Sequence, residues 1–248
     1  MAVIVVGGNK IEFDMQGNGD STMVFLHGIG SDMSVWNELV DYFSPKYKIV
    51  RFDWKGFGES KINAPDPSFA IETMARELQA ILDNLNVGSN FYVIADFPSS
   101  IIALKADIDE LVKSDGIIAI NAADKGKVKV KFNKFSKNLT KEASIKMQDR
   151  VRIEGAIQVR EEIITQWLKE CKQFDISRES PYINTPVDFV IGQKNTSVSE
   201  KDAIQTVGRI PVSRVTMLEG GDLLMLENPK RLISEIEDFI ENYIPEMA

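Results

Sequence analysis

Three stretches decide the fold of this chain, and each begins at the end of an apolar run. They are LHGIGS at Leu26–Ser31, FDWKGFGES at Phe52–Ser60 and LEGGD at Leu218–Asp222. The first follows Thr22–Leu26, a mostly apolar run of the kind found in strands that are buried on both faces of a parallel sheet. Each stretch is therefore expected to form a turn at the carboxyl end of a buried strand.

Outward from these turns, strand patterns alternate with helical patterns along most of the chain. Further strands are expected at Tyr47–Phe52, Phe91–Ala95, Gly116–Ile120, Val187–Ile191 and Arg214–Leu218. Helices are expected at Ile71–Leu85, Ser99–Lys105 and Lys230–Tyr243, and a hairpin at Val3–Val6 and Lys10–Met15. This alternation predicts a mostly parallel, twisted sheet of about eight strands with helices on both faces, made mixed by the first hairpin.

The three stretches resemble the HGxG…W, DxxGxGxS and GGHxxxxExP segments of α/β-hydrolase enzymes such as small esterases, lactonases and haloalkane dehalogenases. Trp36 and the run Leu226–Pro229 extend the first and third matches. The resemblance covers nearly the whole chain except Asn121–Tyr182, where the alternation of strands and helices stops. It implies an α/β-hydrolase fold with a core domain of residues 1–120 and 183–248 and a small, mainly helical cap at residues 121–182.

In this family the nucleophile lies on a sharp turn between a strand and a helix, in the pattern small–x–nucleophile–x–small. The matching turn here is ADFPS at Ala95–Ser99, so the resemblance puts Phe97 at the nucleophile position. A phenyl ring cannot attack a carbonyl carbon. Two other registers stay open, with Asp96 or Ser99 as nucleophile, although each needs larger residues at the tight-contact positions.

The residue after Phe97 bears on the oxyanion hole, because that position normally donates a backbone N–H to it. Pro98 has no N–H to donate. The other donor position, near Ile29, can survive. Since one lost donor typically costs about 3–4 kcal/mol of transition-state stabilisation, we expect a replacement nucleophile to act in a damaged oxyanion hole.

The remaining two catalytic positions of the family also carry other side chains. The acid position is Asn195, at the end of Gly192–Asn195, and the histidine position is Asp222. The one histidine of the chain, His27, lies in the turn after Thr22–Leu26, where the resemblance implies a structural role. Because a serine-type mechanism needs a base beside its nucleophile, we expect no ordinary serine- or aspartate-type hydrolase.

Two function classes are open. The first is a non-hydrolytic protein that binds a small-molecule ligand or a protein partner in or near the old active-site pocket. Its expected ligand-binding residues are His27, Gly28, Ile29, Phe97, Pro98 and Asp222. The second is an enzyme that uses the same pocket for lyase, cyclase, isomerase or atypical hydrolase chemistry, with Asp222 and Asp96 as acid and base groups.

Composition narrows the partners and the setting. The chain has 248 residues and a net charge of −8, so nucleic acid or an anionic membrane is not expected as its main partner. No apolar run reaches the roughly 18 residues that cross a bilayer, and no metal-ligand spacing or phosphate-binding loop predicts a metal or cofactor. The single cysteine, Cys171, excludes an internal disulfide, and a cytoplasmic location is expected.

A basic run interrupts this acidic chain at Lys125–Lys137. Part of the run, Lys127–Phe132, alternates like a strand, and lysines on an exposed edge strand discourage edge-to-edge pairing. The other interpretation is a docking patch for an acidic ligand or partner. Both interpretations stay open.

Overall fold

An eight-stranded sheet forms the centre of the computed structural model, which describes residues 2–65, 67–125 and 145–247. The strands are β1 Ala2–Val6, β2 Asn9–Gln16, β3 Thr22–Leu26, β4 Lys48–Phe52, β5 Phe91–Ala95, β6 Gly116–Ile120, β7 Val187–Gly192 and β8 Ser213–Leu218. Their order across the sheet is β1-β2-β4-β3-β5-β6-β7-β8. β2 pairs antiparallel with β1 and β4, and every pair from β4 to β8 is parallel. The expected mixed, mostly parallel sheet is confirmed.

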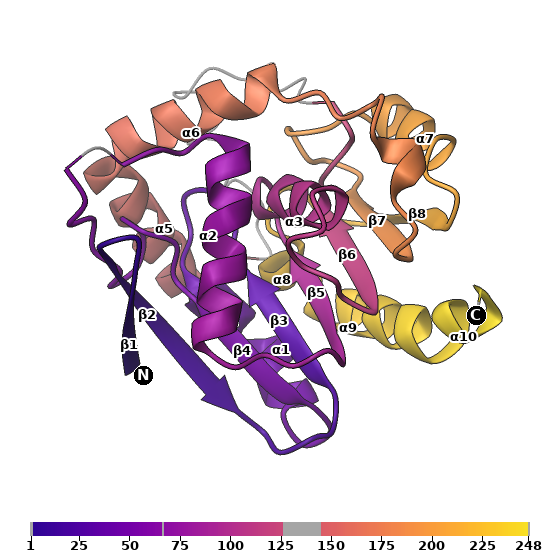
Figure 1. Ribbon diagram of the computed structural model, residues 1–248, viewed down its shortest axis with the longest axis horizontal. Coiled ribbons are helices and arrows are strands. Elements are labelled where there is room, and N and C mark those ends of the chain that lie inside the picture. Colours follow the sequence, from indigo (N-terminus) through magenta and orange to yellow (C-terminus); the bar gives the residue numbers. More distant parts are fainter. Residues whose placement is uncertain (1, 66, 126–144, 248) are drawn as a thin grey trace.

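Helices cover both faces of the sheet (Figure 1). They are η1 Met33–Trp36, α1 Asn37–Phe43, α2 Ile71–Asn84, α3 Ser99–Ile108, α5 Met147–Val159, α6 Glu161–Gln173, η2 Ser180–Tyr182, α7 Glu200–Val207, α8 Leu224–Glu227, α9 Pro229–Asp238, the π-helix η3 Phe239–Tyr243 and α10 Ile244–Met247. α2 and α3 pack together on one face, and α1 contacts α9 on the other. The expected last helix is therefore divided, because its second half is wound as a π-helix.

The register of the parallel strands puts the turns of interest side by side. Leu26 of β3 lies opposite Phe52 of β4 on one side and opposite Ala95 of β5 on the other. The turns after these residues therefore leave the sheet at the same level, at the carboxyl edge where open α/β sheets form their binding sites. β3 and β6 are buried along their whole length, as expected for strands that are covered on both faces.

The described part of the predicted insertion, residues 145–182, contains α5, α6 and η2. α6 lies at the end of the molecule toward which β3 points (Figure 1), and it buries Trp167 and Cys171 completely. The division of the chain into a core and a cap stays a prediction. Most of the basic run lies outside the described residues, while its first member, Lys125, pairs with Asp175 at 3.5 Å.

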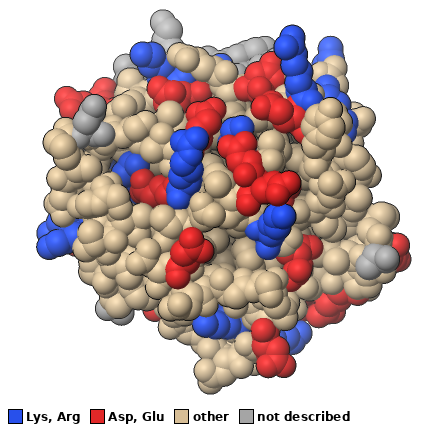
Figure 2. All heavy atoms as spheres, in the orientation of Figure 1, with Lys and Arg blue, Asp and Glu red and all other residues tan. Residues whose placement is uncertain are grey.

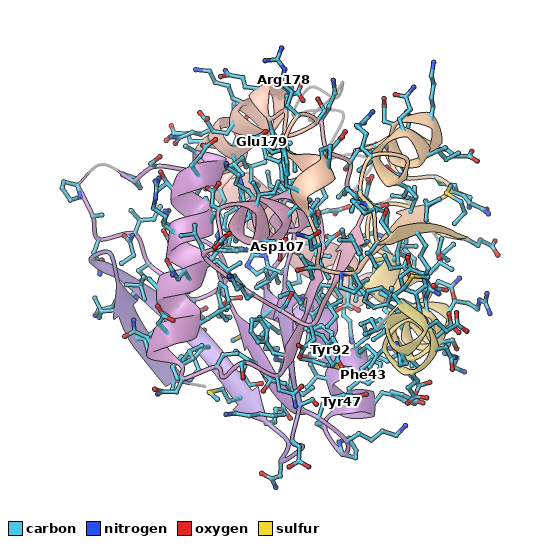
Figure 3. All side chains as sticks on the ribbon, turned by 45° about the vertical axis from the view of Figure 1, so that its right-hand side comes forward. Phe43, Tyr47, Tyr92, Asp107, Arg178 and Glu179 are labelled. Carbon is cyan, nitrogen blue, oxygen red and sulfur yellow. The ribbon has the colours of Figure 1, made fainter. Side chains whose placement is uncertain are left out.

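Acidic and basic side chains are interspersed on the face of the molecule shown in Figure 2, so neighbouring charges compensate each other there. Figure 3 shows Phe43, Tyr47 and Tyr92 at the end of the molecule opposite to Arg178 and Glu179. Within the described parts of the chain, none of the helices combines the length and the apolar character that a membrane span requires.

Asn121 joins the ends of three strands. It directly follows β6, is fully buried and has a φ of +52°. Its side-chain oxygen accepts the N–H of Gly192 at 2.9 Å, and its amide donates to the carbonyl groups of Gly221 and Asp222 at 3.2 and 3.3 Å. Asparagine enters the left-handed region more readily than most residues, so one residue meets both the backbone and the hydrogen-bonding requirement.

We expect Asn121→Ala to lower the free energy of unfolding by about 2–4 kcal/mol, because it leaves buried groups unpaired and puts alanine at a positive φ. Urea denaturation measures the loss. Asn121→Gly is the matched control, since it loses the same hydrogen bonds but accepts the backbone conformation. We expect the glycine variant to be the more stable of the two, and equal losses would contradict the backbone part of this account.

Candidate functional site

The turn between β5 and α3 carries Asp96, Phe97 and Pro98. α3 begins at Ser99, as expected, and the peptide bond before Pro98 is cis. The Phe97 residue is 7% exposed, and its carbonyl oxygen accepts the N–H of Ile29 at 3.1 Å. A backbone hydrogen bond therefore joins the turn after β3 to the turn after β5.

This hydrogen bond occupies a backbone donor that an oxyanion would need. The Ile29 N–H is used by Phe97, and Pro98 has no N–H. The donor near Ile29, which the sequence left open, is thus not free in this structure. An oxyanion that develops at this turn meets neither of the two backbone donors that usually stabilise it.

Gly28 permits the close approach of the two turns. A Cβ atom at this position would lie 2.2 Å from Oδ2 of Asp96 and 2.4 Å from the carbonyl oxygen of Phe97. No side chain fits at these distances. The Asp96 N–H also donates to the Leu26 carbonyl at 3.0 Å, so the two turns contact each other through backbone and side-chain atoms.

The side chain of Asp96 is buried where the turns after β3 and β5 meet. The residue is 3% exposed, and its Oδ1 has no hydrogen-bond partner among the described residues. Burial raises the pKa of Asp96 well above its usual range, and the charges of Asp222 and Glu227 raise it further, while a hydrogen bond from the Phe97 backbone opposes the rise. Asp96 therefore keeps its proton to a higher pH than an exposed aspartate does.

The hydroxyl group of Ser99 has two partners. It donates to the His27 carbonyl at 2.5 Å and accepts the indole N–H of Trp54 at 2.7 Å. Ser99 is fully buried at the start of α3. Its proton is directed to a backbone carbonyl rather than to a base, so the arrangement does not activate Ser99 as a nucleophile.

Both ring nitrogens of His27 face backbone groups. Nε2 accepts the N–H of Trp54 at 3.0 Å, and Nδ1 lies 2.8 Å from the carbonyl oxygen of Gly28. These partners require the neutral tautomer with its proton on Nδ1. Burial lowers the pKa of His27 to about 4, so the ring stays uncharged near neutral pH. His27 thus organises the turns after β3 and β4 and has no free nitrogen for proton transfer.

Asn195 and Asp222 both hold the loop after β7. The Asn195 oxygen accepts the N–H of Ser197 at 3.0 Å, while its amide donates to the Gly192 carbonyl at 2.6 Å. Asp222 is 7% exposed and accepts the N–H and the hydroxyl of Thr196, each at 2.8 Å. Burial raises the pKa of Asp222, and the hydrogen bonds from Thr196 and Ser197 oppose the rise.

The predicted site residues therefore form two groups. Gly28, Ile29, Asp96 and Phe97 lie in direct contact, whereas Asp222 affects Asp96 only as a nearby charge. Two surface hollows of about 990 and 440 Å³ lie along α6 and beside the loop from β7 to α7, and Phe97 and Asp222 line neither of them.

Sequence reasoning missed several partners in this region. Thr196 holds Asp222, and Asn121 ties the turn of Asp222 to β6. The position of Asn121 directly after a predicted strand was the one available signal, and nothing in the sequence distinguished Thr196 from other loop residues. The two hydrogen bonds of Trp54, to Ser99 and His27, had no sequence signal.

Comparisons with known sequences point to one fold. Residues 21–114 match a family model described as alpha/beta hydrolase fold. Karrikin insensitive 2 receptor CA of Petunia hybrida is 39% identical over 79 residues, which are 31% of this chain and 29% of the receptor. Strigolactone esterase RMS3 of Pisum sativum is 32% identical over 83 residues, 32% of this chain and 30% of the esterase. The chain thus spans less than a third of the length of these curated relatives.

Solved structures match over nearly the full chain. A hydrolase from Pseudomonas aeruginosa PA01 has a TM-score of 0.84 at 13% identity and covers 96% of this chain, with 97% of its own length matched. The enol-lactonase from Burkholderia xenovorans LB400 has a TM-score of 0.81 at 15% identity, covering 97% of this chain and 100% of its own. At these identities the similarity shows the fold alone.

Asp96 is expected to make the stability of the protein depend on pH. Its pKa is raised above the value of about 3.9 in an unfolded chain, so its contribution is fully present below about pH 4 and is lost as the pH rises through the folded-state pKa. We expect the melting temperature to fall as the pH rises above about 4, the ordinary pKa of an aspartate. Asp96→Asn cannot ionise, so its melting temperature should fall less over this range.

The matched control for this measurement is Asp20→Asn, which changes an exposed aspartate in a turn. It should follow the wild-type pH profile. Asp53 and Asp222 also have raised pKa values, so a smaller fall should remain in Asp96→Asn. Identical slopes for Asp96→Asn and the wild type would show that Asp96 does not titrate in the folded protein.

Proposed function

We propose that this chain, which has the α/β-hydrolase fold, is a non-hydrolytic protein that lacks the nucleophile–histidine–acid triad and binds a small molecule or a protein partner at the old active-site region. One observation carries the proposal: the Phe97 carbonyl accepts the Ile29 N–H at 3.1 Å, beside a proline that has no N–H. This turn therefore offers no free backbone donor for an oxyanion, and hydrolysis by the usual mechanism of α/β-hydrolases depends on such a donor.

The side chains around the turn support the same proposal. Ester hydrolysis by a serine needs a base within hydrogen-bonding distance of the nucleophile. The single histidine, His27, has both nitrogens engaged by backbone groups. Asn195 and Asp222, at the expected acid and histidine positions, hydrogen-bond to the loop after β7. The hydrogen bonds of these side chains stabilise the fold and leave none of them free as a catalytic base, which favours a binding function over a catalytic one.

The proposed contact residues for the ligand or partner are His27, Gly28, Ile29, Phe97, Pro98 and Asp222. We further propose a core of residues 1–120 and 183–248 with a cap at residues 121–182, and a cytoplasmic location, which the single cysteine of the chain supports. Among the curated relatives, one is named as a receptor and another as an esterase. The receptor name is consistent with a small organic molecule as the ligand.

A second candidate is an enzyme that uses Asp96 and Asp222 as acid and base groups. The observation in its favour is that burial and, to a smaller extent, the charge of Asp222 raise the pKa of Asp96, as in carboxylate pairs that divide acid and base roles. Against it, the two residues are 3% and 7% exposed. A reaction that Asp96→Asn abolishes, without loss of folding, would favour this candidate.

The proposed function predicts that the protein turns over short p-nitrophenyl esters no faster than a heat-denatured sample does. The physical reason is the missing base together with the occupied oxyanion donor. Absorbance of released p-nitrophenol measures the rate. Turnover that is abolished by Ser99→Ala or by Asp96→Ala alone would contradict the proposal and identify the nucleophile. Ser177→Ala, away from the turn, is the control variant.

A second prediction concerns one variant that restores the catalytic groups of the family. It combines Phe97→Ser, Pro98→Gly, Asn195→Asp and Asp222→His. Loss of the buried Phe97 ring should cost about 3–5 kcal/mol of stability, by analogy with Phe→Ala in cores. If the variant folds, we expect weak esterase activity that disappears when position 222 alone is reverted, because the new histidine is its base. Activity that survives this reversion would contradict the assigned role of the position.

A further inference from the structure

Two arginines of α5 and its junction with α6 bind the chain segments that follow β3 and β4. Arg152 of α5 donates from Nη1 to Oδ1 of Asp32 at 2.6 Å and also to the hydroxyl of Ser34. Asp32 follows the turn after β3 and caps η1 by accepting the N–H of Ser34. The ion pair is partly exposed, with 31% of the Arg152 side chain and 20% of the Asp32 side chain accessible.

Arg160, at the junction of α5 and α6, binds the turn after β4. Its Nε donates to the Gly56 carbonyl at 2.6 Å and its Nη2 to the Gly58 carbonyl at 2.8 Å. Ile163 of α6 presses on the same turn, because a Cβ atom at Gly56 would lie 2.8 Å from its Cδ1. A planar guanidinium group is suited to such paired acceptors.

A buried carboxylate connects the two chain segments that the arginines bind. Asp53 is 2% exposed and accepts the N–H groups of Met33 and Glu59 at 2.7 and 3.1 Å, so it connects the turns that Arg152 and Arg160 bind. Burial raises the pKa of Asp53 to about 6, while hydrogen bonds from Ser34 and the charge of Arg152 lower the pKa of Asp32 against burial. Above about pH 7 both carboxylates are therefore charged, with Asp32 paired to Arg152 and Asp53 within the electrostatic influence of Arg160.

An aromatic layer lies between α6 and the turns. The ring of Trp167 on α6 lies 5.3 Å from Phe57, 6.1 Å from Phe69 and 6.2 Å from Trp54, measured between ring centroids. All four residues are at most 1% exposed, and the Trp167 indole nitrogen has no partner among the described residues. The indole N–H of Trp54 donates to the hydroxyl of Ser99, beside the turn after β5. The aromatic layer therefore connects α6 with the proposed binding region.

We propose that Arg152 and Arg160 form a two-point clamp that keeps α5 and α6 closed over the aromatic layer, and that releasing this clamp admits an apolar ligand to the proposed binding region. The inference rests on the proposed function and adds its regulation. The two contacts differ in kind, because Arg152 depends on the charge of Asp32 whereas Arg160 binds neutral carbonyl groups. The Arg152 contact is the one that salt and changes of charge weaken.

The test is hydrogen–deuterium exchange at about pH 7.5, where both carboxylates are charged, on the full chain with Arg152→Gln and Arg160→Gln combined. We expect the amides of α6 to exchange about tenfold faster than in the wild type, while those of β5 stay protected. Binding of the apolar dye 1-anilinonaphthalene-8-sulfonate should rise in the same variant. Arg178→Gln is the control, since the same substitution removes one positive charge from an exposed arginine that extends from the surface (Figure 3).

Unchanged α6 exchange in a folded double variant would overturn the clamp, and so would an equal increase in Arg178→Gln. If the double variant fails to fold, Asp32→Asn replaces it, because this change removes only the charge opposite Arg152 and keeps an acceptor for Ser34. Faster α6 exchange in Asp32→Asn supports the clamp, and unchanged exchange overturns it. Ester turnover by wild-type protein in the same samples would instead overturn the proposed function and leave the clamp standing.

Discussion

The hydrogen bond from the Ile29 N–H to the Phe97 carbonyl, 3.1 Å long, holds together the two turns on which the rest of the site depends. The contact is available because β3 and β5 are neighbours in register, with Leu26 opposite Ala95. It also requires that Gly28 carry no side chain, since a Cβ atom would collide with Asp96 and Phe97. With the turns in contact in this way, the Phe97 carbonyl uses the backbone N–H of Ile29, the donor on which the proposed function rests.

Buried carboxylates show how this chain distributes polar groups around the contact. A buried charge is tolerated when donors surround it. Asp53 accepts two backbone N–H groups, whereas one oxygen of Asp188 accepts an N–H from Arg214 at 2.9 Å and its other oxygen, like one of Asp96, has no partner among the described residues. Asp222 has the N–H and hydroxyl of Thr196. Asp96 has an oxygen without a partner among the described residues, so for it protonation is the remaining way to lower the cost of burial.

The helices α5 and α6 interact with the rest of the chain through two different kinds of contact. The aromatic layer beneath α6 supplies apolar burial, which has no directional requirement. The guanidinium groups of Arg152 and Arg160 supply directional hydrogen bonds to defined atoms of two turns. Burial alone would let α6 slide over the aromatic rings, whereas the directional bonds give the helix one position relative to the turns. The combination accounts for a closed structure over the proposed binding region.

Local sequence patterns were sufficient for the strands, for the start of α3 at Ser99 and for the absence of an N–H at Pro98, because periodicity and residue chemistry act over a few positions. The same patterns left the Ile29 donor free, and only the tertiary structure decided that Phe97 uses it. Likewise, Arg152 and Arg160 bind partners 120 and 104 residues away. Such contacts depend on how the folded sheet brings distant turns together, and a local pattern carries no information on that.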